Sequence, residues 1–312
     1  MGLSGSKNPA RRSESVTDGP ITLESIAKQL EEGMFKNVVI MCGAGISTNA
    51  GVPDFRSPSI GLYHTIGKIE GLPYPEAVFD GSFFRSNPKP FYNLVRQIYP
   101  ERLVPTTTHK FFTLLHQKGL LRRVFTQNID ALEFLGGLPE EKVVEAHGTF
   151  QRSYCTKCRR NYDLPWLKQH IFHPNSDDGV PRCEDSNCRG VVRPDVVLFG
   201  EALPEIFWKR ASEDFPVCDL LLVFGTSLSV APFNTLVQKP RSNVPRVYIN
   251  KSKPGSAGFI GWIMGLSASV KFSGKRDLII QDDCDKIVKQ ICKVNDGWSS
   301  ELNDINVQIL EA

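Results

Sequence analysis

Short runs of consecutive apolar residues recur along the chain and are typical of strands that are buried on both faces of a sheet. The first such run, 37–42, leads directly into a glycine-containing turn. Similar runs occur at 123–126, 142–145, 196–199, 220–224 and 246–249. Segments with helical spacing lie between several of these runs. The pattern therefore predicts an α/β fold built on a mostly parallel, Rossmann-like sheet.

Two further segments have the spacing of amphipathic helices. Between residues 22 and 33, Leu23, Ile26 and Leu30 fall on one helical face, and 285–294 has a similar apolar side. Two stretches, about 57–119 and 151–193, interrupt the alternation, and we interpret them as insertions that form a smaller module. The predicted division is a disordered N-terminal tail (1–20), a Rossmann-like domain (21–56, 120–150 and 194–298), a helical insertion with a cofactor loop (57–119), a zinc-ribbon module (151–193) and a C-terminal tail (299–312).

Composition and charge narrow the class of protein. The 312 residues are 41% hydrophobic and 23% charged, as in soluble globular proteins. A net charge of +3 argues against a protein whose main task is to bind nucleic acid. We find neither a transmembrane-length apolar stretch nor a signal peptide, so we expect an intracellular protein.

The first residues fit an N-myristoylation pattern, with Gly2 as the acceptor. The alternative is an unmodified, disordered tail rich in serine and glycine.

Gly43-Ala44-Gly45-Ile46-Ser47 follows the first predicted strand and precedes a helix-compatible segment. Glycines let a backbone approach a phosphate closely, and a helix N-terminus adds amide hydrogens. The turn departs from the dehydrogenase fingerprint, because Thr48 occupies the third glycine position and no acidic residue follows at the required spacing. Hydride transfer is therefore disfavoured, and a tight turn without a ligand remains the alternative.

Four of the eight cysteines form two pairs. Cys155 and Cys158 are separated by two residues, and Cys183 and Cys188 by four. Two such knuckles predict a four-thiolate zinc site without an open coordination position, hence a structural zinc. Reduced cysteines or disulfides are the alternatives, and the wide second spacer leaves the local geometry open.

Polar residues follow four of the predicted strands: 127–130, His147-Gly148, 225–227 and Asn250-Lys251. In a parallel sheet these strand ends meet along one edge, where such folds bind ligands. His147 is distinguished from the other five histidines by its place at a strand end. A structural histidine is the alternative interpretation.

Together these segments resemble the sirtuin family of NAD-dependent protein deacylases. The matches are 43–47, 51–57, 126–130, His147-Gly148, the four cysteines, 197–201, 225–228 and 249–250, in the family's order. The details are most similar to the class I branch, and within it to the mainly cytosolic member that deacetylates tubulin and histones. Gly261-Trp262-Ile263-Met264-Gly265 and Cys284-Asp285 support that finer placement.

The resemblance implies NAD and a structural zinc as cofactors, the cytoplasm as location with the nucleus second, and acylated-lysine proteins, such as histones and tubulin, as partners. It implies no direct contact with nucleic acid. The residues implied in NAD binding are Gly43, Ala44, Gly45, Ile46, Ser47, Thr48, Asp54, Phe55, Arg56, Gln127, Asn128, Ile129, Asp130, Gly225, Thr226, Ser227, Asn250, Lys251, Ser252 and Cys284.

The resemblance also implies a mechanism in which the acyl oxygen of the substrate lysine attacks the ribose C1′ and nicotinamide leaves. His147 and Asn128 are the implied catalytic residues, with His147 as the general base on a ribose hydroxyl. The products are free lysine and acylated ADP-ribose. The implied peptide-binding strand consists of Val197, Leu198, Phe199, Gly200 and Glu201. A mono-ADP-ribosyltransferase and a zinc-stabilised binding module without chemistry remain as alternatives.

Overall fold

The computed structural model describes residues 21–53, 66, 72–99, 102–174, 176–255, 272 and 274–311. The predictions for Gly2, Asp54, Phe55, Arg56 and the 261–265 motif lie outside these residues. The helices of the described part are α1 (Leu23–Glu31), α3 (Gly81–Ser86), α4 (Lys89–Ile98), α5 (Thr107–Gln117), α6 (Leu132–Leu135), α7 (Leu164–Phe172), α8 (Glu205–Asp214), α10 (Cys284–Val294) and α11 (Trp298–Asp304). None of these helices is long and apolar enough to cross a bilayer.

A six-stranded parallel sheet forms the larger part of the molecule, as predicted. Its strands, in spatial order, are β10 (Asp277–Ile280), β9 (Arg246–Ile249), β8 (Leu220–Phe224), β1 (Val38–Cys42), β3 (Leu121–Thr126) and β4 (Val143–Glu145). In this register Cys42 lies between Thr126 and Phe224. The carboxyl ends of the three central strands are therefore level.

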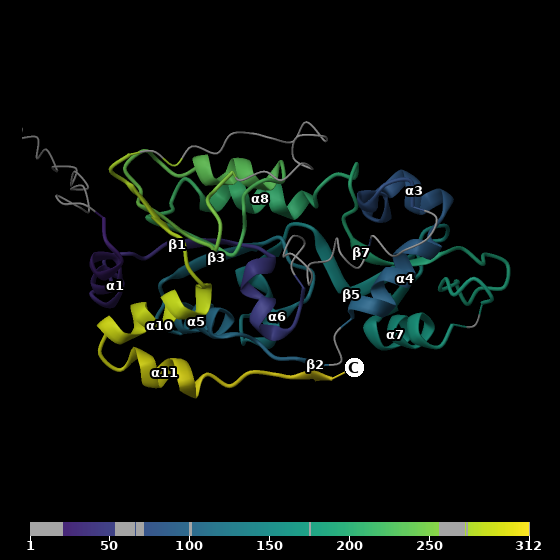
Figure 1. Cartoon of the computed structure of the whole chain (residues 1–312), viewed down its shortest axis with the longest axis horizontal. Coiled ribbons are helices and arrows are strands. Elements are labelled where there is room, and N and C mark those ends of the chain that lie inside the picture. The colour runs from purple at the N-terminus through teal and green to yellow at the C-terminus, as the bar shows by residue number, and fades with distance from the viewer. Residues whose placement is uncertain are drawn as a thin grey trace, which may run out of the picture.

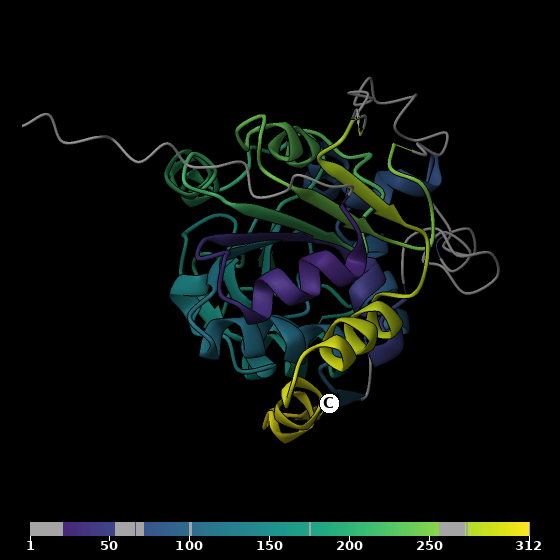
Figure 2. The same cartoon turned by 90° about the vertical axis from the view of Figure 1, so that its left-hand side faces the viewer.

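Both faces of the sheet are covered, which explains the unbroken apolar runs in its strands. In β1, Val38 and Ile40 pack into a core with α1, α5 and α10, whereas Val39 and Met41 pack into a second core with α8. Figure 2 shows the purple α1 and the yellow α10 on one side of the sheet and green segments on the other. Successive side chains of a strand point to opposite faces, so β1 and β8 are apolar at every position.

A smaller module lies at the other end of the molecule (Figure 1). Its three-stranded antiparallel sheet has the order β6 (Asn161–Asp163), β5 (Gly148–Cys155), β7 (Val192–Val196). Its core includes Phe84, Phe91 and Tyr92, and the Phe91 ring meets each of the other two at a centroid distance of 5.3 Å. Helices α3, α4 and α7 belong to this module.

Short 3₁₀ segments complete the described chain: η1 (Ala44–Ile46), η2 (Thr48–Ala50), η3 (Pro75–Phe79), η4 (Glu140–Lys142) and η5 (Phe233–Gln238). The first two occupy the place where a helix was expected after the glycine turn. That expectation is wrong in detail, because the chain makes two successive tight turns there.

The predicted strand at 196–199 is also wrong. Val196 ends β7 of the antiparallel sheet, and Phe199 makes an isolated bridge with Asp80. An apolar run identifies burial but not the sheet in which a strand pairs. The edge strand β10 was not predicted, because its apolar run, Leu278-Ile279-Ile280, is only three residues long.

The C-terminal segment packs on the larger part of the molecule. Trp298, Leu302 and Ile305 join the core below the sheet together with α5. The last strand, β11 (Leu310–Glu311), pairs with β2 (Arg102–Leu103) in antiparallel register. Residues 299–311, which the sequence analysis grouped as a tail, are thus a helix and a strand with tertiary contacts.

Candidate functional site

The loops that follow the central strands are joined to one another by backbone hydrogen bonds. The Gln127 amide donates to the Cys42 carbonyl at 3.0 Å, and the Ala146 amide donates to the Thr126 carbonyl at 2.9 Å. The Gly225 amide reaches the carbonyl of Ile249 at 3.0 Å. The four predicted groups of polar residues therefore lie along one edge of the sheet.

The glycine turn lies directly against the loop after β8. The Gly45 amide donates to the Gly225 carbonyl at 2.8 Å, and Gly225 has a φ of 60°. Next to this contact, the hydroxyl of Thr226 donates to the side-chain carbonyl of Gln127 at 2.6 Å. Thr48 stays within the turn, where its hydroxyl donates to the Gly45 carbonyl at 3.2 Å.

Ser47 connects the glycine turn to the loop after β3. Its buried hydroxyl donates to Asp130 Oδ2 at 2.7 Å and accepts from Asn128 Nδ2 at 3.3 Å. Burial raises the pKa of Asp130, although the hydrogen bonds from Leu132 and Ser47 act in the opposite direction. This chain of contacts fixes the two polar side chains of the loop relative to the turn.

His147 is held in one tautomer by its neighbour. Its Nδ1 lies 3.0 Å from the Gln127 carbonyl oxygen, which can only accept a hydrogen bond. The proton of the neutral ring therefore lies on Nδ1, and Nε2 keeps a free lone pair. Burial lowers the pKa of His147, and the Gln127 carbonyl opposes this shift. A neutral imidazole with an unprotonated Nε2 is the form that a general base requires.

The last predicted cofactor residues gather at the ends of β9 and β8. Asn250 Nδ2 donates to Ser252 Oγ at 2.9 Å, and Ser227 Oγ lies 2.9 Å from the Ser229 hydroxyl. Lys251 Nζ pairs with Asp283 at 3.2 Å. Asp283 caps α10, whose first residue is the buried Cys284. Asn250, Lys251 and Cys284, all implied in NAD binding, therefore lie near one another in space.

The predicted peptide-binding segment 197–201 is anchored on several sides. The Val197 amide donates to the His147 carbonyl at 2.8 Å, and the Phe199 amide donates to the Phe79 carbonyl at 2.7 Å. Glu201 accepts a bidentate pair from Arg193, at 2.8 and 2.9 Å, and also the Leu198 amide at 3.0 Å. Arg193 lowers the pKa of Glu201, although burial alone would raise it. These bonds give the segment a defined shape beside His147.

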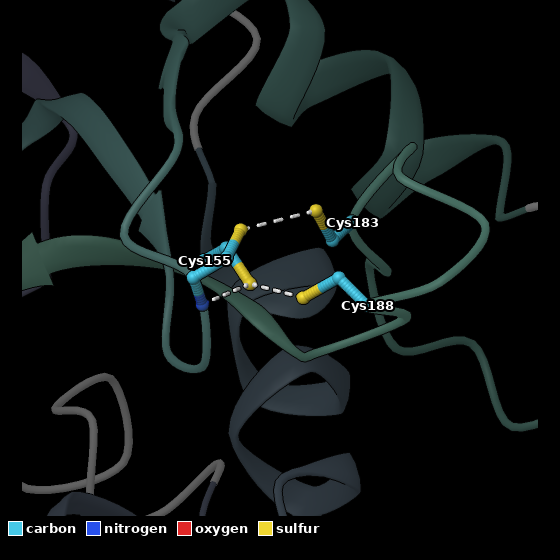
Figure 3. Close-up of side chains that lie close together, drawn as sticks. Cys155, Cys183 and Cys188 are labelled. Carbon is cyan, nitrogen blue, oxygen red and sulfur yellow. Dashed lines mark hydrogen bonds between the residues drawn. The ribbon is translucent and has the colours of Figure 1, made fainter.

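The four paired cysteines form a compact cluster within the small module. Their sulfur atoms all lie within 4.8 Å of one another. The Cys155–Cys188 and Cys158–Cys183 sulfur distances are 3.6 and 3.7 Å. A tetrahedral zinc with ligands at about 2.3 Å requires sulfurs about 3.8 Å apart, so the cluster has the dimensions of a zinc site. Figure 3 shows Cys155, Cys183 and Cys188 converging.

Both knuckles use the same backbone geometry despite their different spacers. The residue after the second cysteine is left-handed in each, with φ values of 65° at Arg159 and 49° at Arg189. In the second knuckle the Cys188 amide donates to the Asp185 carbonyl at 2.9 Å, which folds the extra residues into a turn. A Cβ at Gly190 would lie 2.7 Å from the Cys155 sulfur. The wide spacer is therefore compatible with four equivalent ligands.

One buried group near the site was not predicted. His109 and Glu133 are 0% and 1% exposed, and each contributes an atom to a cluster with Asp130 whose members lie within 4.8 Å of one another. Glu133 lies on a short helix whose sequence carries no sign that a carboxyl is buried. Its position three residues after Asp130 is the only available hint.

Known proteins that are similar to this chain belong to the family that the sequence motifs indicated. The Sir2 family pattern matches residues 43–232. The chain is 46% identical over 285 residues to NAD-dependent deacetylase sir2A of Dictyostelium discoideum, with 91% of this chain and 53% of the relative covered. It is 42% identical over 290 residues to NAD-dependent protein deacetylase sirtuin-2 of Danio rerio, with 91% and 74% covered.

A third relative, NAD-dependent protein deacetylase hst2 of Schizosaccharomyces pombe, is 42% identical over 283 residues, with 91% of this chain and 79% of the relative covered. The chain thus spans about half of the Dictyostelium protein and about three quarters of the other two. The matched region includes the glycine turn, His147 and all four clustered cysteines. The chain therefore belongs to the Sir2 family, the sirtuins.

Proposed function

We propose that this sirtuin is an NAD-dependent protein lysine deacetylase that transfers the acyl group of an acylated lysine to ADP-ribose and releases nicotinamide. The observation that carries the proposal is the fixed tautomer of His147, whose Nδ1 is bonded to the Gln127 carbonyl at 3.0 Å. This bond leaves Nε2 free to accept a proton from a sugar hydroxyl. The names of the relatives in Dictyostelium, Danio and Schizosaccharomyces support the same reaction.

The residues along the sheet edge suit a dinucleotide. Close contact between Gly45 and Gly225 leaves backbone rather than side chains at the turn, which favours a diphosphate. The hydrogen-bonded side chains of Asn128, Ser47 and Asp130 place an amide and a carboxyl beside Gln127, the residue whose carbonyl is bonded to His147. Bound there, NAD supplies the C1′ carbon to which the acyl oxygen bonds. The protein's part is to orient the sugar and to accept a proton at His147.

The four cysteines have a structural role in this proposal. A zinc ion held by four thiolates has no open position for a substrate. Cys155 ends β5, which begins directly after His147, so the metal stabilises the sheet that carries the peptide-binding segment.

The substrate class is an extended acylated peptide lying along residues 197–201. The Arg193–Glu201 pair and the bonds to Phe79 preshape this segment. We include histones and tubulin-like proteins among the substrates, and the cytoplasm, with the nucleus second, as the location. These finer assignments rest on the resemblance to the class I branch.

The test is nicotinamide release from NAD by the purified chain, with and without an acetyl-lysine peptide. We expect release only with the peptide, one nicotinamide per lysine deacetylated, and a fall of about 10²- to 10⁴-fold in His147→Ala. His173→Ala is the matched control, because His173 is exposed on the small module. Peptide-independent release would instead indicate ADP-ribosyl transfer or NAD hydrolysis. No release from a folded, zinc-loaded protein would refute an enzymatic role.

A further inference from the structure

A buried carboxyl lies beneath the loop that carries Asn128 and Asp130, and the proposed reaction does not use it. Glu133 is 1% exposed and belongs to α6, which starts directly after this loop. Ala131, between Asp130 and the helix, has a left-handed φ of 62°. This rare conformation for a non-glycine residue turns the chain back so that both carboxyls approach the same buried space.

Two hydroxyl groups connect Asn128 to the two carboxyls. On one side, Asn128 Nδ2 donates to Ser47, whose hydroxyl donates to Asp130 Oδ2 at 2.7 Å. On the other side, the Asn128 backbone amide donates to Thr126 Oγ1 at 3.0 Å, and hydrogen bonding by the Thr126 hydroxyl lowers the pKa of Glu133. Glu133 therefore supports the loop from below, through Thr126.

His109 closes the cluster from α5. The Thr106 backbone amide donates to its Nδ1 at 3.2 Å, so the proton of the neutral ring lies on Nε2. Nε2 is fully buried and has no hydrogen-bond partner among the described residues. One ring nitrogen of His109 lies within 4.8 Å of carboxyl oxygens of Asp130 and Glu133. In this tautomer Nε2 is a donor, which disfavours a metal ion and suits a carboxyl group.

The charges around Glu133 favour its neutral form. Burial and the nearby Asp130 raise its pKa to about 8, although the Thr126 hydroxyl acts in the opposite direction, and Glu145 on β4 adds to the rise. Cys42 on β1, 3.7 Å from Glu133, is a thiol whose own pKa burial raises. Burial also lowers the pKa of His109 to about 3, so this ring adds no positive charge near neutral pH.

We propose that Glu133 is a positioning residue for the Asn128–Asp130 loop and acts as an uncharged carboxylic acid bonded through Thr126. Asp130, which accepts hydrogen bonds from Ser47 and the Leu132 amide, carries the negative charge of the pair. Ionisation of Glu133 places two like charges in one buried space and displaces the loop. The inference rests on the proposed function, because the loop is there assigned to NAD.

The test compares Glu133→Gln, which mimics the neutral acid, with Glu133→Ala, which removes the support. We expect the Gln variant to bind NAD at neutral pH as the unchanged chain does, and the Ala variant to bind it about tenfold more weakly, with the peptide KM preserved. Above about pH 8 the unchanged chain should lose NAD affinity and Glu133→Gln should not. Glu145→Gln is the control, since it removes a nearby carboxyl that is not bonded to Thr126.

A second measurement does not depend on activity. A group whose pKa is raised on folding destabilises the fold as pH rises from its unfolded value, about 4.3, to its folded value. The melting temperature of Glu133→Gln should therefore rise relative to the unchanged chain between about pH 5 and pH 8. If Glu133→Gln behaves like Glu133→Ala, or if the melting curves keep the same pH dependence, the inference is wrong. If the unchanged chain has no deacetylase activity but shows this melting behaviour, the proposed reaction is wrong and the proposal of a neutral Glu133 still stands.

Discussion

Gly45 and Gly225 approach each other so closely that neither position has room for a side chain. A Cβ at Gly45 would lie 2.8 Å from the Gly225 Cα and carbonyl oxygen, and one at Gly225 would lie 2.5 Å from the Ile46 nitrogen. Both contacts are with backbone atoms, which cannot rotate away. The turn after β1 and the turn after β8 are thus packed backbone to backbone at the proposed NAD site.

Replacement of Gly45 by alanine should therefore separate the two turns. We expect Gly45→Ala to lower the free energy of unfolding by about 1–3 kcal/mol and to weaken NAD binding at least tenfold. Denaturant unfolding and NAD titration measure the two effects. Gly119→Ala is the control, because Gly119 has a φ of 70° but nothing within 4 Å of its Cβ position. Equal NAD affinity in both variants would argue against a role for this contact.

Removal of one cysteine of the cluster should abolish zinc binding and destabilise the small module. Structural zinc binding is coupled to folding, so we expect Cys155→Ser to lose the bound metal, about one ion per chain in the unchanged protein, and to melt at a lower temperature. Metal analysis and thermal unfolding report both effects. Cys292→Ser, a buried cysteine outside the cluster, should keep its zinc. A stable and active Cys155→Ser protein without zinc would contradict the prediction.

The Arg193–Glu201 pair should matter for the peptide and not for NAD. Glu201→Gln weakens the bidentate contact that shapes residues 197–201, so we expect the peptide KM to rise about tenfold while the NAD KM stays constant. Steady-state kinetics with each substrate varied in turn separates the two. Asp277→Asn is the matched control, since it breaks the buried Arg246–Asp277 pair between β9 and β10. An equal rise of the peptide KM in both variants would show that the effect is general destabilisation.

The low pKa of His147 sets the acid limit of the proposed reaction. Burial lowers this pKa below its ordinary value of 6.5, so the ring stays neutral, and able to accept a proton, somewhat below that pH. We expect kcat/KM for the peptide to fall to half its neutral-pH value only below pH 6.5, the midpoint that an ordinary histidine would give. A decline that begins above pH 7 would show that another group limits the rate.

Much of the fold follows from local sequence patterns. Five of the six parallel strands are apolar runs, and the cysteine spacing identifies the metal ligands. The prediction failed at 196–199, because burial does not reveal the pairing partner. It also missed β10, whose apolar run is only three residues long. The burial of Glu133 was also missed, since it depends on α5 and β1 packing around α6, far away in sequence.

His147 lies at the place where the chain passes from one sheet to the other. Glu145 ends β4, an edge strand of the parallel sheet, and Gly148 begins β5 of the antiparallel sheet. The return passage runs through Val197, whose amide is bonded to the His147 carbonyl. Figure 1 shows β5 and β7 leading from this point into the small module. A rotation of the small module about these two neighbouring connections would move the zinc cluster further than the imidazole of His147, because the imidazole lies beside the connections.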